Sequence, residues 1–459
     1  MTFHFACSQG HQWGDADGHT VPVGVRGESC PVCGNAGSVV PQLELGEAFL
    51  SSSAAEPALV VREDAAEQPV LDAPSNRDRD LTKRGGKWRV LAGAAIVVTM
   101  IAGMIFSVVH GKHTKERDQH LNQGQNYFQQ QEYDRALNEF SEAIRLDPTC
   151  AIAFANRAST YFNQGELEHA INDCNHALEL DSRLVVGYAN RAGAYLNKGE
   201  LQRAIDDCTR AIELDPQSIL AFANRGAAHL NKGDLDRAIS DCTRALELEP
   251  QSALAFANRG AAYFNKGDFD RAIFDCSQAV ANNPSMALAY QNRAAAFLSK
   301  GDFNGAFADC SQALRLNPAL ARAYALRATA CFNKGDDLQA IADGDEALRR
   351  DPSLTFVYLN RGLAHLRLGE TDKALQDFNQ VIEHEPRLAM AYVYRGAVHL
   401  SRNDSKQVIA DCSRALELDP KLALAYWNRG LAYARLDDPK HAEADQNKAL
   451  ELDPSLGQP

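Results

Sequence analysis

The sequence lacks the motifs that mark several large enzyme classes. It contains no Gly-x-x-x-x-Gly-Lys phosphate loop, no Gly-x-Ser-x-Gly nucleophile elbow and no His-Glu-x-x-His metalloprotease motif. No nucleophile and base are spaced so that they would be expected to converge. We therefore expect a protein that is not an enzyme.

The sequence also lacks an excess of positive charge. It has 47 Lys and Arg against 60 Asp and Glu, which gives a formal net charge of -13. A nucleic-acid groove needs a basic stripe that displaces counterions from phosphates, so this balance argues against nucleic acid as a partner. The first 40 residues contain no apolar run, and we expect no cleavable signal peptide.

Proline, by contrast, recurs at a fixed spacing along most of the chain. Every interval is a multiple of 34 residues, and only Ser182 interrupts the series. The members are Pro148, Pro216, Pro250, Pro284, Pro318, Pro352, Pro386, Pro420 and Pro454. A period of this length is typical of stacked pairs of helices. We number each unit from position 1, beginning at Arg117 and restarting every 34 residues.

Other columns agree with this numbering. Position 4 is aromatic in nine units, position 8 is Gly or Ala in all ten, and positions 20 and 27 are almost always Ala. Small residues let two antiparallel helices approach closely, while aromatic rings fill the space between successive pairs. Gly at position 15 is expected to end the first helix, and Pro at position 32 to follow the second.

These columns resemble the tetratricopeptide repeat (TPR) family, over about three quarters of the chain. The resemblance implies an all-α fold, a right-handed TPR superhelix (α-solenoid) of ten helical hairpins, and binding of peptides or proteins. The expected repeats are 117–150, 151–184, 185–218, 219–252, 253–286, 287–320, 321–354, 355–388, 389–422 and 423–456.

Two further columns predict how the helices are held together. Position 7 is Arg in nine units and position 23 is acidic in all ten, so we predict a ladder of Arg to Asp pairs with a structural role. Position 24 is Cys in six units. Equivalent atoms of neighbouring repeats should lie about 9 Å or more apart, because helix axes pack at roughly 8–10 Å. A disulfide needs Cα atoms within about 7 Å, so we interpret these cysteines as core residues.

The candidate binding site is a column of asparagines at position 6, on the first helices that line the concave surface in TPR superhelices. An amide offers a donor and an acceptor together, as a peptide backbone does, so this ladder could hold an extended peptide. The alternative is that the amides hydrogen-bond neighbouring helices. The eight candidates are Asn122, Asn156, Asn190, Asn224, Asn258, Asn292, Asn360 and Asn428.

Residues 1–40 resemble a short zinc ribbon. Cys30-Pro-Val-Cys33 is followed by Gly34, and Cys7 with His11 would complete a Cys3His set for one structural zinc ion. His4 or His19 could replace His11, and the alternative is a segment without metal. Four protein ligands leave zinc no open coordination position, so we expect no catalysis there.

A linker and an apolar segment separate this part from the repeats. Residues 41–89 are rich in Ala, Glu, Ser and Pro and read as a disordered linker. Residues 90–109 carry no charge, and twenty residues span roughly 30 Å as a helix, so we predict a transmembrane helix over 90–110 that contacts the lipid bilayer. The fifteen residues before it hold six Lys and Arg and the fifteen after it hold three, which favours a cytoplasmic N-terminus and repeats outside. The reduced cysteines favour the opposite orientation.

Together these features predict a membrane-anchored TPR scaffold, in the inner or cytoplasmic membrane of a bacterium, that binds protein or extended peptide partners in its concave groove. The alternative is a signalling or assembly regulator whose zinc ribbon contacts nucleic acid or a cytoplasmic protein. Residues 1–40 hold only one basic residue, Arg26, which weighs against contact with DNA.

The zinc assignment can be tested on the full chain. We expect one equivalent of zinc per molecule, and we expect the double substitution Cys30→Ser with Cys33→Ser to abolish it, because two of four ligands are lost. Metal analysis of the purified protein measures this. Full zinc retention in the double variant would contradict the assignment.

Overall fold

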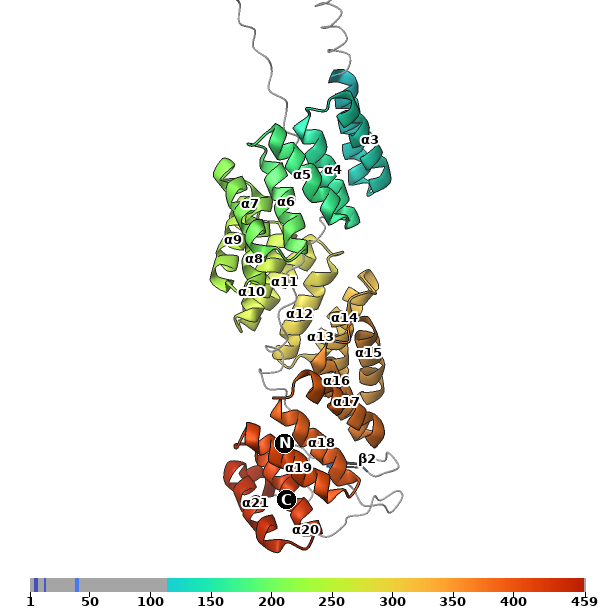
Figure 1. Ribbon diagram of the computed structural model, residues 1–459, viewed down its shortest axis with the longest axis vertical. Helices are drawn as coiled ribbons and strands as arrows, with labels where there is room; N and C mark the ends of the chain where they lie inside the picture. The colour runs from blue at the N-terminus through green and yellow to red at the C-terminus, as the bar shows by residue number, and fades with distance from the viewer. Residues whose placement is uncertain (1–3, 7–11, 14–37, 41–113, 458–459) are drawn as a thin grey trace, which may run out of the picture. The chain divides into compact units, whose positions relative to one another are not determined.

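The computed structural model describes residues 4–6, 12–13, 38–40 and 114–457. The chain divides into two compact units, one of which ends at Ala262 while the other continues from Tyr263 to the C-terminus. We call them the N-terminal and C-terminal units and describe each by itself (Figure 1).

Three short strands lie in the first forty residues. They are β1 (His4–Ala6), β2 (Gln12–Trp13) and β3 (Ser38–Val40), and they form an antiparallel sheet in the order β2-β1-β3. The predicted zinc ligands Cys7, His11, Cys30 and Cys33 lie outside the described residues, as do the linker and residues 90–109. Among the helices of residues 114–457, none is long and apolar enough to cross a membrane.

Paired helices make up the described part of the N-terminal unit (Figure 1). The first covers residues 114–129. It is followed by α3 (Tyr133–Leu146), α4 (Ala151–Gln164), α5 (Leu167–Leu180), α6 (Val185–Asn197), α7 (Leu201–Leu214), α8 (Ile219–Asn231), α9 (Leu235–Leu248) and α10 (Ala253–Asn265), the last of which ends beyond the unit boundary.

The C-terminal unit continues the same alternation. Its helices are α11 (Phe269–Asn282), α12 (Ala287–Ser299), α13 (Phe303–Leu316), α14 (Ala321–Asn333), α15 (Asp337–Arg350), α16 (Thr355–Arg367), α17 (Thr371–His384), α18 (Ala389–Ser401), α19 (Ser405–Leu418), α20 (Ala423–Arg435) and α21 (Pro439–Leu452), with a final 3-10 turn η1 (Pro454–Gly457). The described residues therefore contain ten helical hairpins, which confirms the predicted all-α repeat architecture and its 34-residue period.

The turn inside each hairpin is set by position 15. Seven units have Gly there with φ between 75° and 85°, which is the left-handed region that glycine adopts without strain. Three units keep the same geometry without Gly, at Gln131, Asn403 and Asp437, where φ is 57° to 60°. The turn is therefore imposed by the packing of the two helices as well as by glycine.

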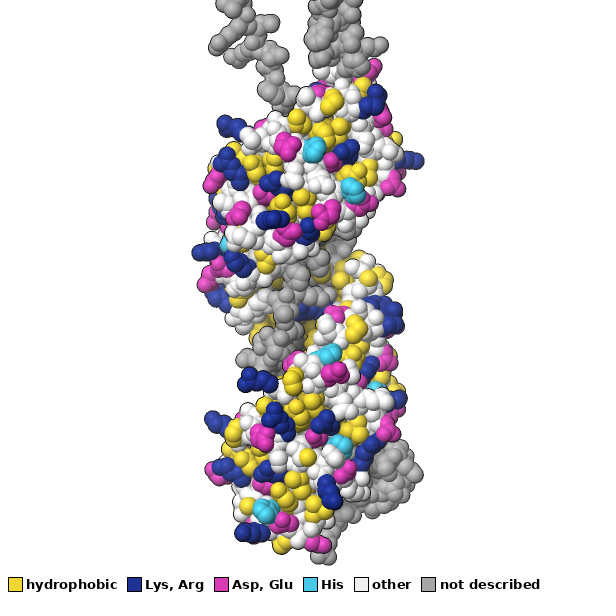
Figure 2. Space-filling view, viewed as in Figure 1, with side chains coloured by type: hydrophobic (Ala, Val, Ile, Leu, Met, Phe, Trp, Pro, Cys, Tyr) yellow, Lys and Arg dark blue, Asp and Glu magenta, His cyan; other side chains and the backbone are white. Residues whose placement is uncertain are grey.

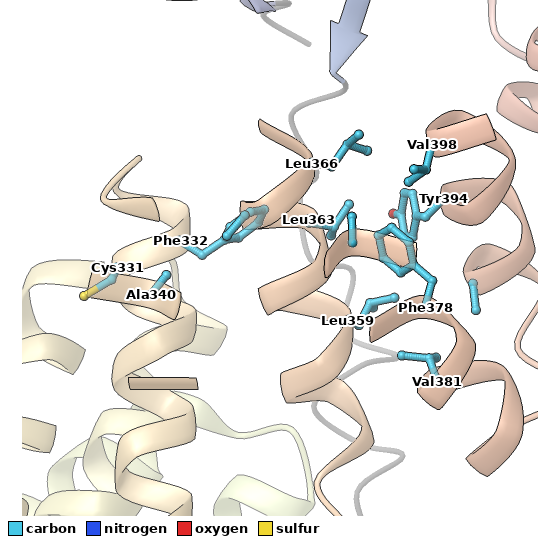
Figure 3. Close-up of a cluster of buried hydrophobic side chains, with 13 residues drawn as sticks. Cys331, Phe332, Ala340, Leu359, Leu363, Leu366, Phe378, Val381, Tyr394 and Val398 are labelled. Atoms are coloured by element: carbon cyan, nitrogen blue, oxygen red, sulfur yellow. The ribbon is translucent and has the colours of Figure 1, made fainter. Parts of the chain in front are cut away.

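The core consists mainly of small residues between the helices, and larger side chains are concentrated in repeats seven to nine. There Phe332, Leu363, Phe378 and Tyr394 form part of one buried cluster, drawn in Figure 3. The Phe378 ring occupies position 24, where most units have Cys. Gly362 accommodates it, because a Cβ atom at Gly362 would lie 2.9 Å from Phe378 Cε1.

The predicted Arg to Asp ladder is confirmed in eight repeats. The Nε and Nη2 atoms of each position-7 arginine donate to both carboxylate oxygens of the position-23 aspartate in the same hairpin, at 2.6 to 3.0 Å. The arginines are Arg157, Arg191, Arg225, Arg293, Arg327, Arg361, Arg395 and Arg429. Their side chains are 18 to 24% exposed and the aspartates 3 to 11%. The carboxylate raises the pKa of the arginine, for example at Arg225.

The six position-24 cysteines are free and buried, as predicted. They are Cys174, Cys208, Cys242, Cys276, Cys310 and Cys412. Burial disfavours the thiolate and raises the pKa of Cys174 to about 12. These thiols are therefore unreactive packing residues at neutral pH.

One ion pair departs from the repeat pattern. Asp337 stands at position 17, where the preceding units have an aromatic ring or Leu, and it contacts Arg367 of the next repeat at 2.6 Å. The Asp337 side chain is 5% exposed, and burial raises its pKa to about 6 despite the arginine. Burial also lowers the pKa of Arg367. Desolvation of both side chains therefore opposes the ionised form of this pair.

We predict that the pair Asp337→Phe with Arg367→Asn, which copies Phe303 and Asn333 of the preceding junction, raises stability at pH 7 by about 1–4 kcal/mol. Arg367→Asn alone should cost about 3–5 kcal/mol, because it leaves a buried carboxylate unpaired. The midpoint of urea unfolding measures both changes.

The pH dependence provides a second check. The folded state binds a proton at Asp337 more tightly than the unfolded state does, since the folded pKa is about 6 and the ordinary value is 3.8. Stability from this group therefore increases as pH falls from 7 towards 4. The advantage of the double variant should shrink over this range, and an advantage that stayed constant would contradict a titrating Asp337.

Candidate peptide-binding surface

The position-6 asparagines lie between the first helices of neighbouring repeats. Asn190 Nδ2 donates to the Ala155 carbonyl oxygen at 3.1 Å, and Asn224 Nδ2 donates to the Ala189 carbonyl oxygen at 3.3 Å. Asn258 Nδ2 makes the equivalent contact to the Ala223 carbonyl oxygen at 3.4 Å, whereas Asn360 Nδ2 donates to the hydroxyl group of Thr329 in the preceding repeat at 2.9 Å. In these four cases the amide donor joins successive repeats, which is the alternative that the sequence left open.

Burial divides the eight asparagines into two groups. Asn224, Asn258, Asn360 and Asn428 are 2 to 6% exposed. Asn156, Asn190 and Asn292 are half-buried, and Asn122 is exposed. A side chain in the first group is covered by protein and is positioned for packing, whereas the second group presents amide surface to solvent. Contact of the ladder with a peptide stays a prediction, and only the second group is placed to make it.

Position 9, which holds small residues beside the ladder, provides no free space in three of the repeats. Gly193, Ala227 and Ala295 at this position are buried. A Cβ atom at Gly193 would lie 3.6 Å from Asn224 Nδ2 and 3.6 Å from the Phe162 ring. The small residue therefore makes room for the asparagine of the next repeat and leaves no space for a ligand at these positions.

The amides at position 13 are used within their own helices. Asn163 Nδ2 donates to the Ser159 carbonyl oxygen at 2.9 Å, and Asn333 Nδ2 donates to the Thr329 carbonyl oxygen at 2.8 Å. At the same position Arg367 Nη2 donates to the Phe332 carbonyl oxygen at 2.7 Å, with its guanidinium carbon 3.7 Å from the centre of the Phe332 ring. Replacement of Asn by Arg here adds a cation to the first-helix face.

Two shallow pockets are lined largely by side chains that are already paired. One, of about 440 Å³, lies over the Arg225–Asp241 and Arg244–Glu247 pairs of α8 and α9. The other, of about 360 Å³, lies beside Asp270 and Lys300, which contact each other. We assign neither to a ligand. Within residues 114–457, no group of three or more His, Cys, Asp or Glu side chains could hold a metal ion.

Comparison with protein families matches the repeats directly. Models described as tetratricopeptide repeat match residues 151–183, 185–218, 219–252, 253–286, 291–354, 356–388 and 423–456, and one described as TPR repeat matches residues 124–165. Residues 389–422 contribute a further helical hairpin, α18 and α19. No curated protein matches the chain.

Several solved structures are similar in part. A tetratricopeptide repeat protein from Parabacteroides merdae is 18% identical, over 55% of this chain and 99% of that one, with a TM-score of 0.42. MamA from Desulfovibrio magneticus RS-1 is 24% identical, over 37% of this chain and 96% of that one, with a TM-score of 0.35. YrrB, described as a TPR protein with an unusual peptide-binding site, is 24% identical, over 40% and 95%, with a TM-score of 0.31.

TM-scores below 0.5 are too low to transfer a binding site from any of these proteins. The family matches, however, cover more than half of the chain and coincide with the helical hairpins of the structure. The chain therefore belongs to the tetratricopeptide repeat family, whose members mediate interactions between proteins.

Proposed function

We propose that this protein is a membrane-anchored scaffold whose first helices hold an extended polypeptide segment of a partner. The observation that carries the proposal is the partial exposure of three position-6 asparagines, Asn156, Asn190 and Asn292, in a protein of a family that mediates protein interactions. An amide that is partly open to solvent can exchange hydrogen bonds with a peptide backbone regardless of its side chains. The selectivity of such contacts for partner sequence is weak.

The anchoring and the metal belong to the same proposal. Residues 90–109 would fix the chain in a bilayer, with the repeats outside the cytoplasm, and Cys7, His11, Cys30 and Cys33 would hold one structural zinc ion. The support is the uncharged run of twenty residues, the excess of Lys and Arg before it and the ligand spacing. We propose no enzymatic activity.

Substitutions can distinguish the role of the half-buried amides from that of the buried Asn224 amide. We expect Asn156→Ala with Asn292→Ala to weaken binding of an unfolded polypeptide about tenfold, because each lost hydrogen bond is worth about 0.5–1.5 kcal/mol. The thermal melting temperature should stay nearly unchanged. Fluorescence anisotropy with labelled, reduced and carboxymethylated α-lactalbumin measures the affinity of the full chain.

Asn224→Ala is the matched control. It removes a buried bond to the Ala189 carbonyl oxygen, so it should lower the melting temperature while changing the affinity of the folded protein little. If the Asn156 and Asn292 variant binds as tightly as the unmodified protein, the ladder has no role in capture and the groove proposal fails.

A further inference from the structure

The ends of the second helices carry an anomaly of charge in repeats five to seven. In six other repeats, positions 29 to 31 hold two acidic residues and one uncharged residue or histidine, as in Glu213-Leu214-Asp215. In repeats five, six and seven these positions read Ala281-Asn282-Asn283, Arg315-Leu316-Asn317 and Arg349-Arg350-Asp351. The charge of these three positions therefore changes from two negative units per repeat to zero in repeat five and one positive unit in repeats six and seven. Repeat one, with Arg145-Leu146-Asp147, is neutral there and does not adjoin the other three. Position 2 of repeat seven adds Arg322, where the other units from repeat two onward have apolar residues.

Contacts place these arginines around one junction in the C-terminal unit. Arg350, at the end of α15, donates through Nε to the Pro318 carbonyl oxygen at 3.1 Å and lies 4.4 Å from the centre of the Tyr324 ring of α14. Pro318 is in the turn that follows Arg315, and Arg322 begins the next helix. Arg350 is therefore partly buried, whereas Arg315 and Arg349 are exposed. Arg349 forms a solvent-facing pair with Glu346 at 2.8 Å, and Arg315 Nε donates to Gln312 Oε1 at 2.9 Å, so a partner carboxylate would have to compete with these local contacts.

The same three second helices expose apolar side chains. Phe274 of α11 is 59% exposed and Leu338 of α15 is 73% exposed. At position 22, two turns before position 29 on the same helix face, α11, α13 and α15 carry Phe274, Ala308 and Ala342, all exposed. Repeats two to four have Asn172, Asp206 and Ser240 there. We call Phe274, Ala308, Arg315, Leu338, Ala342 and Arg349 the outer patch.

We propose that the outer patch docks an acidic segment of a partner protein that also carries apolar side chains. The arginines would pair with carboxylates, for which the planar guanidinium group is suited, and the apolar residues would cover Phe274 and Leu338. This surface is on the second helices, and the proposal is independent of the groove formed by the first helices.

The surrounding charges favour a short acidic peptide over a long polyanion. Glu383 and Glu385 end the second helix of the next repeat, α17, and Lys, Arg, Asp and Glu side chains are interspersed over the visible face in Figure 2. A nucleic acid or an anionic membrane would extend past the outer patch onto these carboxylates, and the net charge of -13 would repel it. A peptide of about a dozen residues would not extend past the outer patch onto these carboxylates.

The test uses the full chain, purified in mild detergent, and a fluorescent 14-residue peptide of Asp, Glu, Leu and Gly. We expect binding that weakens as salt is raised, and a loss of about tenfold or more in Arg315→Glu with Arg349→Glu, since two guanidinium groups that would pair with peptide carboxylates are replaced by groups of like charge. Glutamate already occupies position 29 in six repeats, so this variant is compatible with the fold.

Arg203→Glu with Arg237→Glu is the matched control. Both arginines are exposed second-helix residues of the N-terminal unit, and the net charge changes equally. Binding should stay within about twofold in the control and fall in Phe274→Ser with Leu338→Ser. An equal loss in the control, no binding of the acidic peptide, or tighter binding of an oligothymidine or of phosphatidylglycerol vesicles would overturn the proposal.

Discussion

Stacking of the repeats depends on the position-7 guanidinium group. Two of its nitrogens bind the aspartate of the same hairpin, and the third, Nη1, donates to the position-25 side chain of the preceding hairpin in nine repeats, from Arg157 with Ser141 to Arg429 with Ser413, at 2.6 to 3.3 Å. The central carbon of each of these guanidinium groups lies 5.6 Å from the centre of the aromatic ring at position 4 of the same repeat. One side chain thus closes its own hairpin and fixes it to its neighbour, which is the nearest-neighbour coupling that a repeat protein needs.

The 34-residue period made most of the fold of the repeats predictable from the sequence. Helix bounds, the turn at position 15, the free cysteines and the Arg to Asp pairs all follow from columns that repeat along the chain, because each column samples the same environment many times. The asparagine column is different. An amide at position 6 can donate to a bound peptide or to the carbonyl of the preceding helix, and both acceptors are backbone oxygens. Only the register of neighbouring helices, seen at Asn224 and Ala189, distinguishes them.

Some residues differ from those at the same position of the other repeats, and their contacts could not be predicted from the sequence alone. Phe140 and Phe378 replace Cys at position 24, and each faces Gly at position 8 of its own repeat, because a Cβ atom there would lie within 3 Å of the ring. Tyr394 replaces Asn at position 6 and is fully buried, and its hydroxyl group has no partner among the described residues. Asp337 and Arg367 replace a ring and an amide. Pairs such as these are visible in the sequence, but their contact is defined only by the fold.

The first and second helices of the repeats are proposed to have different roles in binding, and these roles follow from the chemistry of their side chains. If the half-buried amides hold a peptide backbone as proposed, they do so without reading its sequence, and such a groove would contribute affinity and little selectivity. The side chains of the outer patch take no part in the hydrogen bonds of the position-7 arginines, so they can vary from repeat to repeat without loss of those bonds. Repeats six and seven have varied in this way, since they have arginines at helix ends where six other repeats have carboxylates, while their Arg293–Asp309 and Arg327–Asp343 pairs remain in place. Complementary charge chiefly discriminates between partners and accelerates their encounter. Selectivity in this protein is therefore expected to come from the variable outer surface, and the constant inner column supports the stack on which that surface is displayed.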